Sequence, residues 1–418
     1  MFHLHTGHQV QLLQGTQEFF PALIAAMDAA QYTVQIETYI FDFTSSGAEI
    51  GDALIRTAKR GLDVRLLVDG VGTAKIPDLW CERFIAAGVQ WRIFNPLGAL
   101  GLLLPSRWRR LHRKLCVLDA ALPQAVAFCG GINVLDDFYD PNHGVLAAPR
   151  FDFCVRVTGP LVGQVRVACE QSWARAQVPV ANVGKLKAAV EGVKDAFMRT
   201  RSSWFGKTES LDHTNPDNLS QTYVTKAGLL LRDNFRNRKL IERAYLKAIG
   251  GAHQEILIAN AYFLPGHRLR KALIAAAGRG VSVKLLLQGK YEYFMQYHAA
   301  RPIYSALLGA GVQIYEYVPS FLHAKVAVID ADGIKSWATV GSSNLDPLSL
   351  LLAREANVVV QEGIFAQELR RRLINAMEAE GLHIDPGQYE RRPWIQRSLD
   401  YLALGLMRIA LWITGNRY

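Results

Sequence analysis

The sequence predicts an α/β protein built from two homologous halves, and three observations support that fold class. The chain has 418 residues, which suits two domains of about 200 residues each. Half of the residues are hydrophobic and a fifth are charged, so both domains can bury a core. Apolar runs typical of strands alternate with amphipathic segments typical of helices, and this succession occurs twice along the chain.

Four pairs of segments match between the halves in the same order. The pairs are AKRGLDVRLLVDG with AGRGVSVKLLLQG (58–70, 277–289), FIAAGVQWRIFNP with LLGAGVQIYEYVP (84–96, 307–319), LHRKLCVLDA with LHAKVAVIDA (111–120, 322–331) and CGGIN with VGSSN (129–133, 340–344). The preserved order indicates a duplication, so the two halves should share one fold.

Each half begins with an apolar strand, TVQIETYIF or EILIANAYF, followed by an amphipathic helix, a second strand, a second helix and a third strand. Strands rich in Val, Ile and Leu that alternate with helices indicate βαβ units and a largely parallel sheet. The His-x-Lys segment and the Gly-x-x-Asn segment that follow should form neighbouring strands joined by a turn.

The expected domains are residues 1–205 and 206–390, followed by an apolar tail over 391–418. The boundary falls in the polar, turn-rich stretch 182–225. The tail could lie along a membrane surface, pack on the body or form an oligomer contact. We expect no transmembrane span, since no run reaches the ~20 apolar residues required, and no secretory signal at the start of the chain.

The net charge and the cysteine content restrict the class of partner and the cellular compartment. The net charge is +10 and the pI about 9.3, which favours either nucleic acid or an acidic membrane face as partner. Five cysteines without a C-x-x-C pair argue against a disulfide framework and for a reducing compartment.

The chemistry is expected from one polar set that occurs twice, each member displaced by 211 positions. The set is His112, Lys114, Asp119, Gly130, Gly131 and Asn133, and then His323, Lys325, Asp330, Gly341, Ser342 and Asn344. On a strand, residues i and i+2 face the same side, so imidazole and ammonium project together. A duplication alone would preserve apolar positions, whereas here the polar ones persist.

Two such sets facing each other could transfer a phosphodiester without a metal. One neutral histidine would attack phosphorus while the other, protonated, would donate to the leaving oxygen. The lysines, with Asn133, Asn344 and Ser342 as phosphate-binding candidates, would stabilise the charge on the phosphate oxygens.

These motifs resemble the signature of the phospholipase D superfamily, H-x-K-x4-D followed by G-G/S-x-N. HRKLCVLD and HAKVAVID match its first element fully, and ten residues separate each motif aspartate from the following glycine, which suits a longer hairpin loop. The chain is similar over nearly its whole length to the B-type bacterial cardiolipin synthases. The stretches that carry this similarity are QIETYIFDF, RLHRK, LLRDNFRNRKLIERAYLKAI, ANAYFLPG, GSSNLDPLSLLLAREANVVV and RRPW.

The resemblance implies two α/β/α sandwich domains related by a pseudo-twofold axis, with one active site at their interface. It implies phosphatidyl transfer to phosphatidylglycerol through a covalent histidine intermediate, with no metal or other cofactor. His112 is then the expected nucleophile and His323 the acid/base. Asp152 and Glu355 are candidates to orient the histidines, while Asp119 and Asp330 complete the catalytic motif with a turn-stabilising role expected.

Glu37 and Asn260 near the end of the first strand of each half are expected to be equivalent to each other. They could line the headgroup site, because ligands bind at the carboxyl ends of strands. Simple buried hydrogen bonding is the alternative.

The choice between membrane and nucleic acid depends on an insert at 95–111 that the second half lacks. Phe94 and His112 are 18 positions apart, whereas Tyr317 and His323 are six apart. The insert holds a leucine-rich run and a basic run, whereas a nuclease groove should interleave basic and stacking aromatic residues. We therefore predict a membrane contact, with packing under the neighbouring domain as the alternative. Its candidate residues are Leu102, Leu103, Leu104, Trp108, Arg109 and Arg110.

The expected partners are therefore phosphatidylglycerol and an anionic membrane surface, at the cytoplasmic face of the bacterial inner membrane, with no nucleic acid. A phospholipase D-type hydrolase and a nuclease are the enzymatic alternatives. An anionic-lipid-binding scaffold is the non-enzymatic one. The sequence does not predict an oligomeric state.

Overall fold

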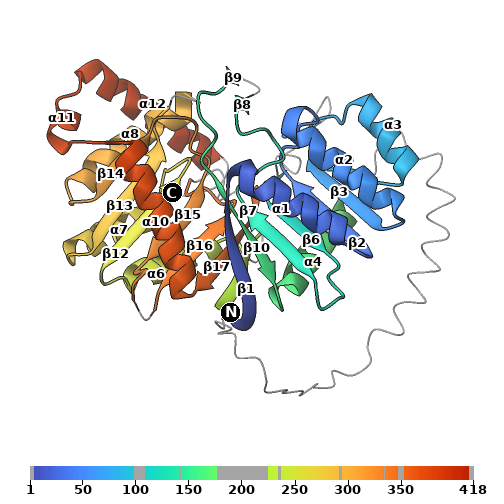
Figure 1. Cartoon of the computed structure of the whole chain (residues 1–418). Helices are drawn as coiled ribbons and strands as arrows, with labels where there is room; N and C mark the ends of the chain where they lie inside the picture. Colours follow the sequence, from blue (N-terminus) through green and yellow to red (C-terminus); the bar gives the residue numbers. More distant parts are fainter. Residues whose placement is uncertain are drawn as a thin grey trace, which may run out of the picture.

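The structure is a computed structural model that describes residues 4–97, 109–140, 143–176, 225–233, 237–290, 294–333, 335–346 and 353–413. The strands of the two halves stand side by side, with helices along their faces (Figure 1). The expected boundary near residue 205 lies outside the described residues.

The first half contains a mixed sheet in the order β1-β10-β7-β6-β2-β3-β4. Its strands are β1 (His5–Gln14), β2 (Thr33–Thr38), β3 (Asp63–Asp69), β4 (Gln90–Phe94), β6 (Lys114–Leu118), β7 (Val126–Gly130) and β10 (Phe153–Thr158). Its helices are α1 (Gly15–Ala29), α2 (Ser45–Lys59), α3 (Asp78–Ala87) and α4 (Leu161–Arg175). The short strands β5 (Arg110–Leu111), β8 (Tyr139–Asp140) and β9 (Gly144–Val145) lie apart from this order.

The second half repeats that arrangement in the order β11-β17-β16-β15-β12-β13-β14-β18. Its strands are β11 (Thr225–Arg232), β12 (Glu255–Asn260), β13 (Ser282–Gln288), β14 (Gln313–Tyr317), β15 (Lys325–Ile329), β16 (Trp337–Gly341), β17 (Ala353–Gln361) and β18 (Gly381–His383). Its helices are α6 (Leu240–Gly250), α7 (His267–Gly278), α8 (Phe294–Leu308), α10 (Gly363–Glu380), α11 (Pro386–Glu390) and α12 (Trp394–Ile413).

The expectation of a largely parallel sheet is wrong, because most strand pairings in each half are antiparallel. β2 pairs parallel with β3, and β3 with β4, as helical crossovers require. By contrast, β6 pairs antiparallel with both β2 and β7, and β10 antiparallel with β7. Short hairpin connections reverse the chain, so the strand after each His-x-Lys motif runs against it. The expected pairing of these two strands is confirmed in both halves.

The two halves share a core and a sheet edge. β1 pairs antiparallel with β11, so the hydrogen-bonded order continues from one half into the other. A hydrophobic cluster takes in inward-facing residues of both sheets, including Leu115 and Val155 from the first and Val326 and Val358 from the second. Helices α4 and α10 complete this cluster, while the outer helices cover separate cores.

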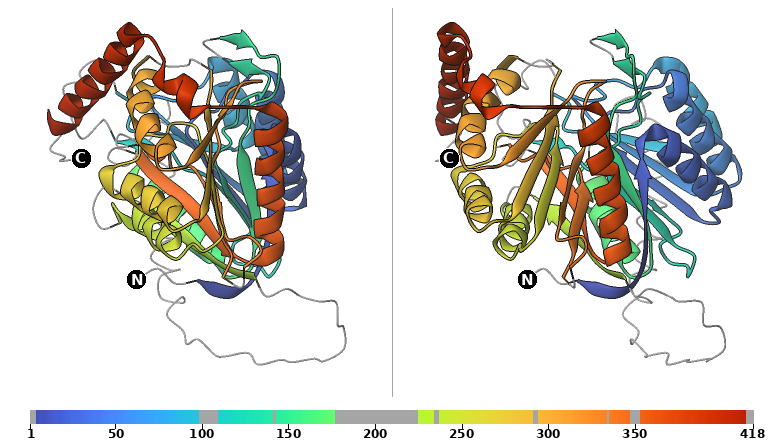
Figure 2. Two further views of the ribbon diagram at one scale, coloured as in Figure 1. Left: turned by 90° about the vertical axis from the view of Figure 1, so that its left-hand side faces the viewer. Right: turned by 60° about the vertical axis from the view of Figure 1, so that its left-hand side comes forward.

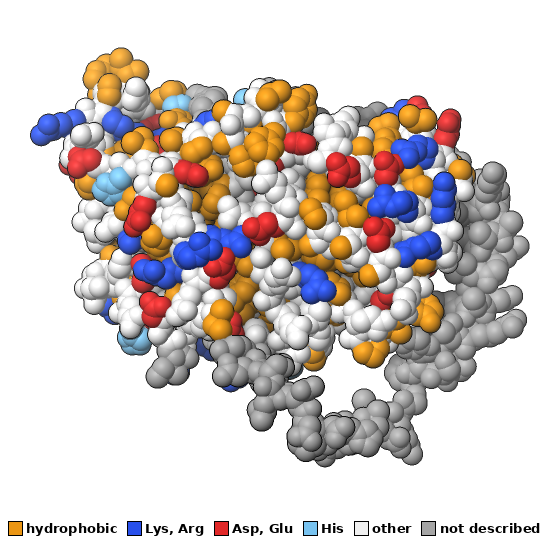
Figure 3. Space-filling model, viewed as in Figure 1, with side chains coloured by type: hydrophobic (Ala, Val, Ile, Leu, Met, Phe, Trp, Pro, Cys, Tyr) orange, Lys and Arg blue, Asp and Glu red, His pale blue; other side chains and the backbone are white. Residues whose placement is uncertain are grey.

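The tail packs on the body, one of the alternatives left open by the sequence. One side of α12 buries Ala403, Leu404 and Met407 beside α8, and Asp400 pairs there with His298 at 2.7 Å. The helix stands at the upper end of the molecule in both views of Figure 2. Figure 3 shows hydrophobic side chains at the upper left, where α11 and α12 lie in Figure 1. No helix in the described residues is long and apolar enough to cross a membrane.

Candidate active site

The two His-x-Lys motifs meet where the halves join. His112 lies two residues before β6, and His323 lies two residues before β15. Each histidine is held by backbone of the opposite half: His112 N donates to Arg354 O (3.1 Å) and His323 N donates to Phe151 O (2.9 Å). These crossed hydrogen bonds bring the two motifs into one site, as the repeat predicted.

Each imidazole also contacts a carboxylate from the other half. His112 Nδ1 lies 3.1 Å from Glu355 Oε1, and His323 Nδ1 lies 2.7 Å from Asp152 Oδ2. Both carboxylates are buried, so each can fix the tautomer of its ring and leave Nε2 to react. This is the geometry expected of the two orienting residues.

The motif lysines concentrate positive charge in a desolvated place. Lys114 Nζ donates to His112 O (2.9 Å), and Lys325 Nζ donates to His323 O. Burial and the neighbouring Lys325 lower the pKa of Lys114 to about 7. Two buried ammonium groups close together favour an anionic ligand that would relieve their repulsion.

The histidines and their carboxylates are tuned differently in the two halves. Burial lowers the pKa of His112, although Glu355 opposes that shift. Burial, Lys325 and Lys114 lower the pKa of His323 further. Burial raises the pKa of Asp152 to about 7 against the pull of Lys325, whereas burial of Glu355 is outweighed by His112 and Lys114, so its pKa is lowered. These pKa shifts favour the charged form of Glu355 more than that of Asp152.

The phosphate-binding candidates separate into different roles. Asn133 Oδ1 accepts from Ile40 N (3.1 Å), which fixes its side chain at the end of β7. Asn344 is buried, and within the described residues its Oδ1 has no hydrogen-bond partner. Ser342 corrects our expectation: its hydroxyl donates to Glu355 Oε2 (2.5 Å) and accepts from Ala356 N (3.1 Å). It therefore supports the carboxylate and does not face a phosphate.

Asp119 and Asp330 make the contacts of a structural residue. Asp119 accepts three backbone N–H bonds, from Gln31, Tyr32 and Thr33. Asp330 does the same for residues 253–255. Both have φ of 49° and lie at the far end of the motif strand from the histidine. The geometry is that of the expected turn-stabilising role.

Glu37 and Asn260 are not equivalent, which corrects the sequence alignment. Ile36 lies opposite Cys116, and Ile258 lies opposite Ala327, the counterpart of Cys116. Glu37 therefore corresponds to Ala259, and Asn260 to Thr38. The alignment was one residue out of step, which moves a side chain to the other face of the sheet.

Neither residue faces a headgroup site. Glu37 accepts from Arg113 Nη2 (3.1 Å), with both side chains buried. Asn260 Oδ1 accepts from Leu345 N (3.1 Å). Buried hydrogen bonding, the alternative weighed from the sequence, describes both contacts.

Sequence reasoning missed two residues that hold the motif loops. Asp69 Oδ2 accepts from Leu111 N (2.7 Å), and its counterpart Gln288 Oε1 accepts from Leu322 N (3.1 Å). The repeat aligned VDG with LQG, so the shared polar position was visible there. Its role was not visible, because it depends on which loop folds over the strand end.

The predicted membrane contact is only partly described. Leu102, Leu103, Leu104 and Trp108 lie outside the described residues. Arg110 corrects our expectation, since its guanidinium pairs with the buried Asp69 (3.1 Å) and donates to Asn95 O (2.9 Å). Arg109 O accepts from Asn95 Nδ2 (3.1 Å), so this residue anchors the end of the insert.

Fold and site together define a two-domain α/β enzyme with paired His-x-Lys motifs, the phospholipase D-like class. The chain belongs to the family described as cardiolipin synthase, PLD-like domain, whose model matches residues 23–147 and 245–377. Cardiolipin synthase B of Salmonella typhimurium is 35% identical over 404 residues, covering 96% of this chain and 88% of that protein. The Escherichia coli K12 cardiolipin synthase B is 34% identical with the same coverage.

A solved structure agrees with the fold. The phosphatidylserine synthase of Haemophilus influenzae superposes with a TM-score of 0.65, covering 98% of this chain and 95% of that one. At 14% sequence identity the match supports the two-domain architecture alone.

Proposed function

We propose that this protein is a cardiolipin synthase that transfers the phosphatidyl group of phosphatidylglycerol to the hydroxyl of a second phosphatidylglycerol. The observation that carries the proposal is the crossed site, in which two histidines, each set by a carboxylate from the opposite half, share two buried lysines. Family membership with two cardiolipin synthases B as relatives supports the choice of lipid.

In the first step, His112 Nε2 attacks phosphorus and the bond from phosphorus to the glycerol oxygen breaks. His323 gives its proton to that oxygen, so glycerol leaves and a phosphatidyl-histidine remains. In the second step, the incoming hydroxyl gives its proton to His323 while its oxygen attacks phosphorus and the P–N bond breaks. Lys114 and Lys325 stabilise the charge on the non-bridging oxygens.

The anionic substrate also explains how a histidine of lowered pKa can act as the acid. In the free site burial and the two lysines lower the pKa of His323. A bound phosphodiester compensates the charge of the lysines and so raises the basicity of the ring. No step in this scheme calls for a metal or a cofactor.

We further propose that the protein works at the cytoplasmic face of the bacterial inner membrane as a peripheral protein. The outer flank of α12 supports this, because Ile395, Leu402, Leu406 and Ile409 recur at helical spacing and are 48–64% exposed. Such a helix suits the plane of the bilayer interface. The basic net charge favours an anionic surface.

The decisive experiment gives the protein labelled phosphatidylglycerol in mixed micelles. We expect cardiolipin and glycerol as products. Phosphatidic acid alone would make the protein a hydrolase, and cleavage of single-stranded oligonucleotides without lipid turnover would make it a nuclease.

Histidine variants test the mechanism. We expect His323→Asn to accumulate a phosphohistidine adduct, detected by retained label after denaturation, and His112→Asn to form none. The opposite pattern would exchange the two roles. Unchanged function in cells for both variants would instead favour a lipid-binding scaffold.

A further inference from the structure

One position beside the histidines differs sharply between the halves. The register that pairs Ile36 with Cys116 and Ile258 with Ala327 makes Tyr39 and Ala261 equivalent, three residues further on. The Tyr39 ring lies 5.0 Å from the His112 ring between centroids, and Lys114 Nζ lies 5.5 Å from the Tyr39 ring. In the second half the equivalent residue, Ala261, carries only a methyl group.

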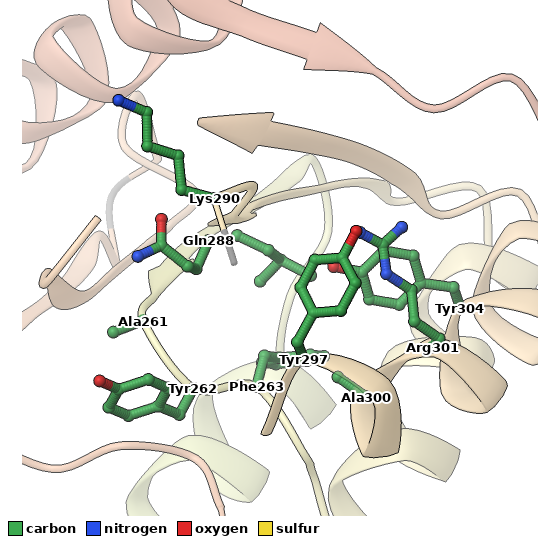
Figure 4. Close-up of a pocket in the computed structure, with 10 residues that line it drawn as sticks. Ala261, Tyr262, Phe263, Gln288, Lys290, Tyr297, Ala300, Arg301 and Tyr304 are labelled. Carbon is green, nitrogen blue, oxygen red and sulfur yellow. The ribbon is translucent and has the colours of Figure 1, made fainter. Parts of the chain in front are cut away.

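A recess lies beside Ala261, at the carboxyl ends of β12 and β13 (Figure 4). Ala261 N donates to Ala324 O (3.0 Å), and Gln288 Oε1 accepts from Leu322 N (3.1 Å). Two residues that line the recess therefore hydrogen-bond to the backbone of both chain neighbours of His323.

The walls of the recess suit a small hydroxylated group. Gln288 and Lys290 lie on one side, and Tyr297, Arg301 and Tyr304 on the other (Figure 4). Gln288 Nε2 is buried and has no hydrogen-bond partner within the described residues, so an acceptor beside it would be stabilising.

The charges around the recess further restrict the chemical class of the ligand. Arg301 pairs with Glu316 at 2.9 Å, which neutralises its charge. Lys290 Nζ donates to Pro319 O (2.8 Å), which holds the ammonium group at the rim. A hydroxyl oxygen could accept a hydrogen bond from Gln288 Nε2, and it would bring no negative charge into the recess.

The proposed reaction requires such a subsite on the His323 side. In an in-line displacement the leaving oxygen departs opposite the nucleophile, and the incoming hydroxyl of the second step approaches from that same side. With His112 as nucleophile, both alcohols stand next to His323.

We propose that this recess, kept open by Ala261, is the alcohol subsite of the enzyme. It binds the glycerol group that leaves in the first step and the glycerol headgroup of the acceptor in the second. The assignment rests on the proposed function, and it names Ala261, Gln288 and Lys290 as the residues that select an alcohol over water.

The test measures how the covalent intermediate divides between acceptor and water. The protein is given phosphatidylglycerol in mixed micelles, and the ratio of cardiolipin to phosphatidic acid is determined. We expect Ala261→Phe, which fills the recess, and Lys290→Met, which removes a donor, each to lower that ratio about tenfold or more. Hydrolysis of the adduct to phosphatidic acid should persist, since water needs no recess.

Lys284→Met is the matched control for Lys290→Met. Lys284 lies on the same strand and pairs with Glu255 at 3.6 Å, near the opposite end of β13 from the recess. Its ratio should equal that of the parent protein.

Equal ratios of cardiolipin to phosphatidic acid in the Lys290→Met and Lys284→Met variants would overturn the subsite. This criterion also holds if thermal unfolding shows that Ala261→Phe does not fold. A parent protein that turns over no phosphatidylglycerol would instead overturn the proposed function.

Discussion

Individual residues set the protonation of this site. Lys114 and Asp152 are both buried, and both have a pKa shifted to about 7, by burial in each case and in opposite directions. Desolvation disfavours the charged form of each group, so the lysine releases its proton more readily and the carboxyl keeps its proton longer. Two groups that the reaction needs charged thus titrate in the same range.

We expect kcat/KM for phosphatidylglycerol to fall on both sides of about pH 7. As pH rises, Lys114 loses the charge that attracts the phosphodiester. As pH falls, Asp152 takes up a proton and no longer stabilises charge on His323. A pH profile checks this, and Lys114→Arg should move the basic limb upward because guanidinium stays charged. A basic limb that stays in place in this variant would assign it to another group.

The buried pair of Glu37 and Arg113 exists in the first half alone. The corresponding positions in the second half are Ala259 and Ala324. Arg113→Ala should lower the free energy of unfolding by about 3–5 kcal/mol, because it leaves Glu37 without its cation in the interior, where burial already raises the pKa of the carboxyl. Adding Glu37→Ala should recover part of that loss, as the second half tolerates two alanines. Urea unfolding of the single and double variants measures both effects.

Arg56→Ala is the control for that series. Its partner is Asp28, and both side chains are about half exposed. Its loss should cost at most about 1 kcal/mol. The variant that combines Arg113→Ala with Glu37→Ala should lose less free energy of unfolding than the sum of the two single variants. A loss equal to that sum would contradict the buried ion pair as the cause.

At the scale of single residues, the sequence predicted the histidines and lysines because the duplication repeats them at fixed spacing. Asp152 and Glu355 were candidates because of the family resemblance and their equivalent strands. It did not predict Arg113 with Glu37, because a buried pair is recognisable only once the register is known. For the same reason it assigned Ser342 to a phosphate, whereas the fold turns that hydroxyl toward Glu355.

At the scale of elements, the residues at the ends of strands position the carboxylates of this site. β7 ends at Gly130, and the next residue, Gly131, approaches Asp152 so closely that a Cβ would lie 2.3 Å from Oδ1. The counterpart of Gly131 is Ser342, which hydrogen-bonds the longer Glu355. Each half thus fits the residue at the strand end to the carboxylate beside it.

Gly131→Ala should displace Asp152 from His323 and lower turnover about a hundredfold, the scale expected for an ångström-sized misplacement. Gly163→Ala in α4 is the control, since a Cβ there meets nothing within 4 Å. Lipid turnover with thermal unfolding separates the two effects. Equal turnover in both variants would show that Asp152 does not need this approach.

At the scale of elements, the alternation of strands and helices was predictable from hydrophobic periodicity. The direction of the hairpin strands and the register of β2 against β12 were not. These strands are buried on both faces, so their apolar runs lack the alternation that would reveal a shift by one residue.

At the scale of the whole molecule, helix α12 lies on the outside and has apolar residues on two of its sides. α12 uses one flank to pack near α8 and leaves the other exposed, with Arg397 and Arg408 also exposed along its length. We expect Leu402→Asp combined with Leu406→Asp to weaken binding to phosphatidylglycerol vesicles about tenfold or more, because both leucines lose burial in lipid. Vesicle sedimentation measures this, and turnover in detergent micelles should persist.

Ile364→Asp is the matched control, because Ile364 is 53% exposed on α10, away from α12. It should bind vesicles as the parent does. A change in oligomeric state of the double variant, with unchanged vesicle binding, would make the flank a subunit contact.

The crossed pairing of each histidine with the other half's carboxylate has a consequence for ancestry. A chain with a single repeat would carry an imidazole and a carboxylate that could not reach each other within one fold. Such an ancestor could have worked only as a pair of identical chains, each completing the other's site. Fusion of two copies into one chain would make the pairing permanent and leave Tyr39 and Ala261 free to diverge.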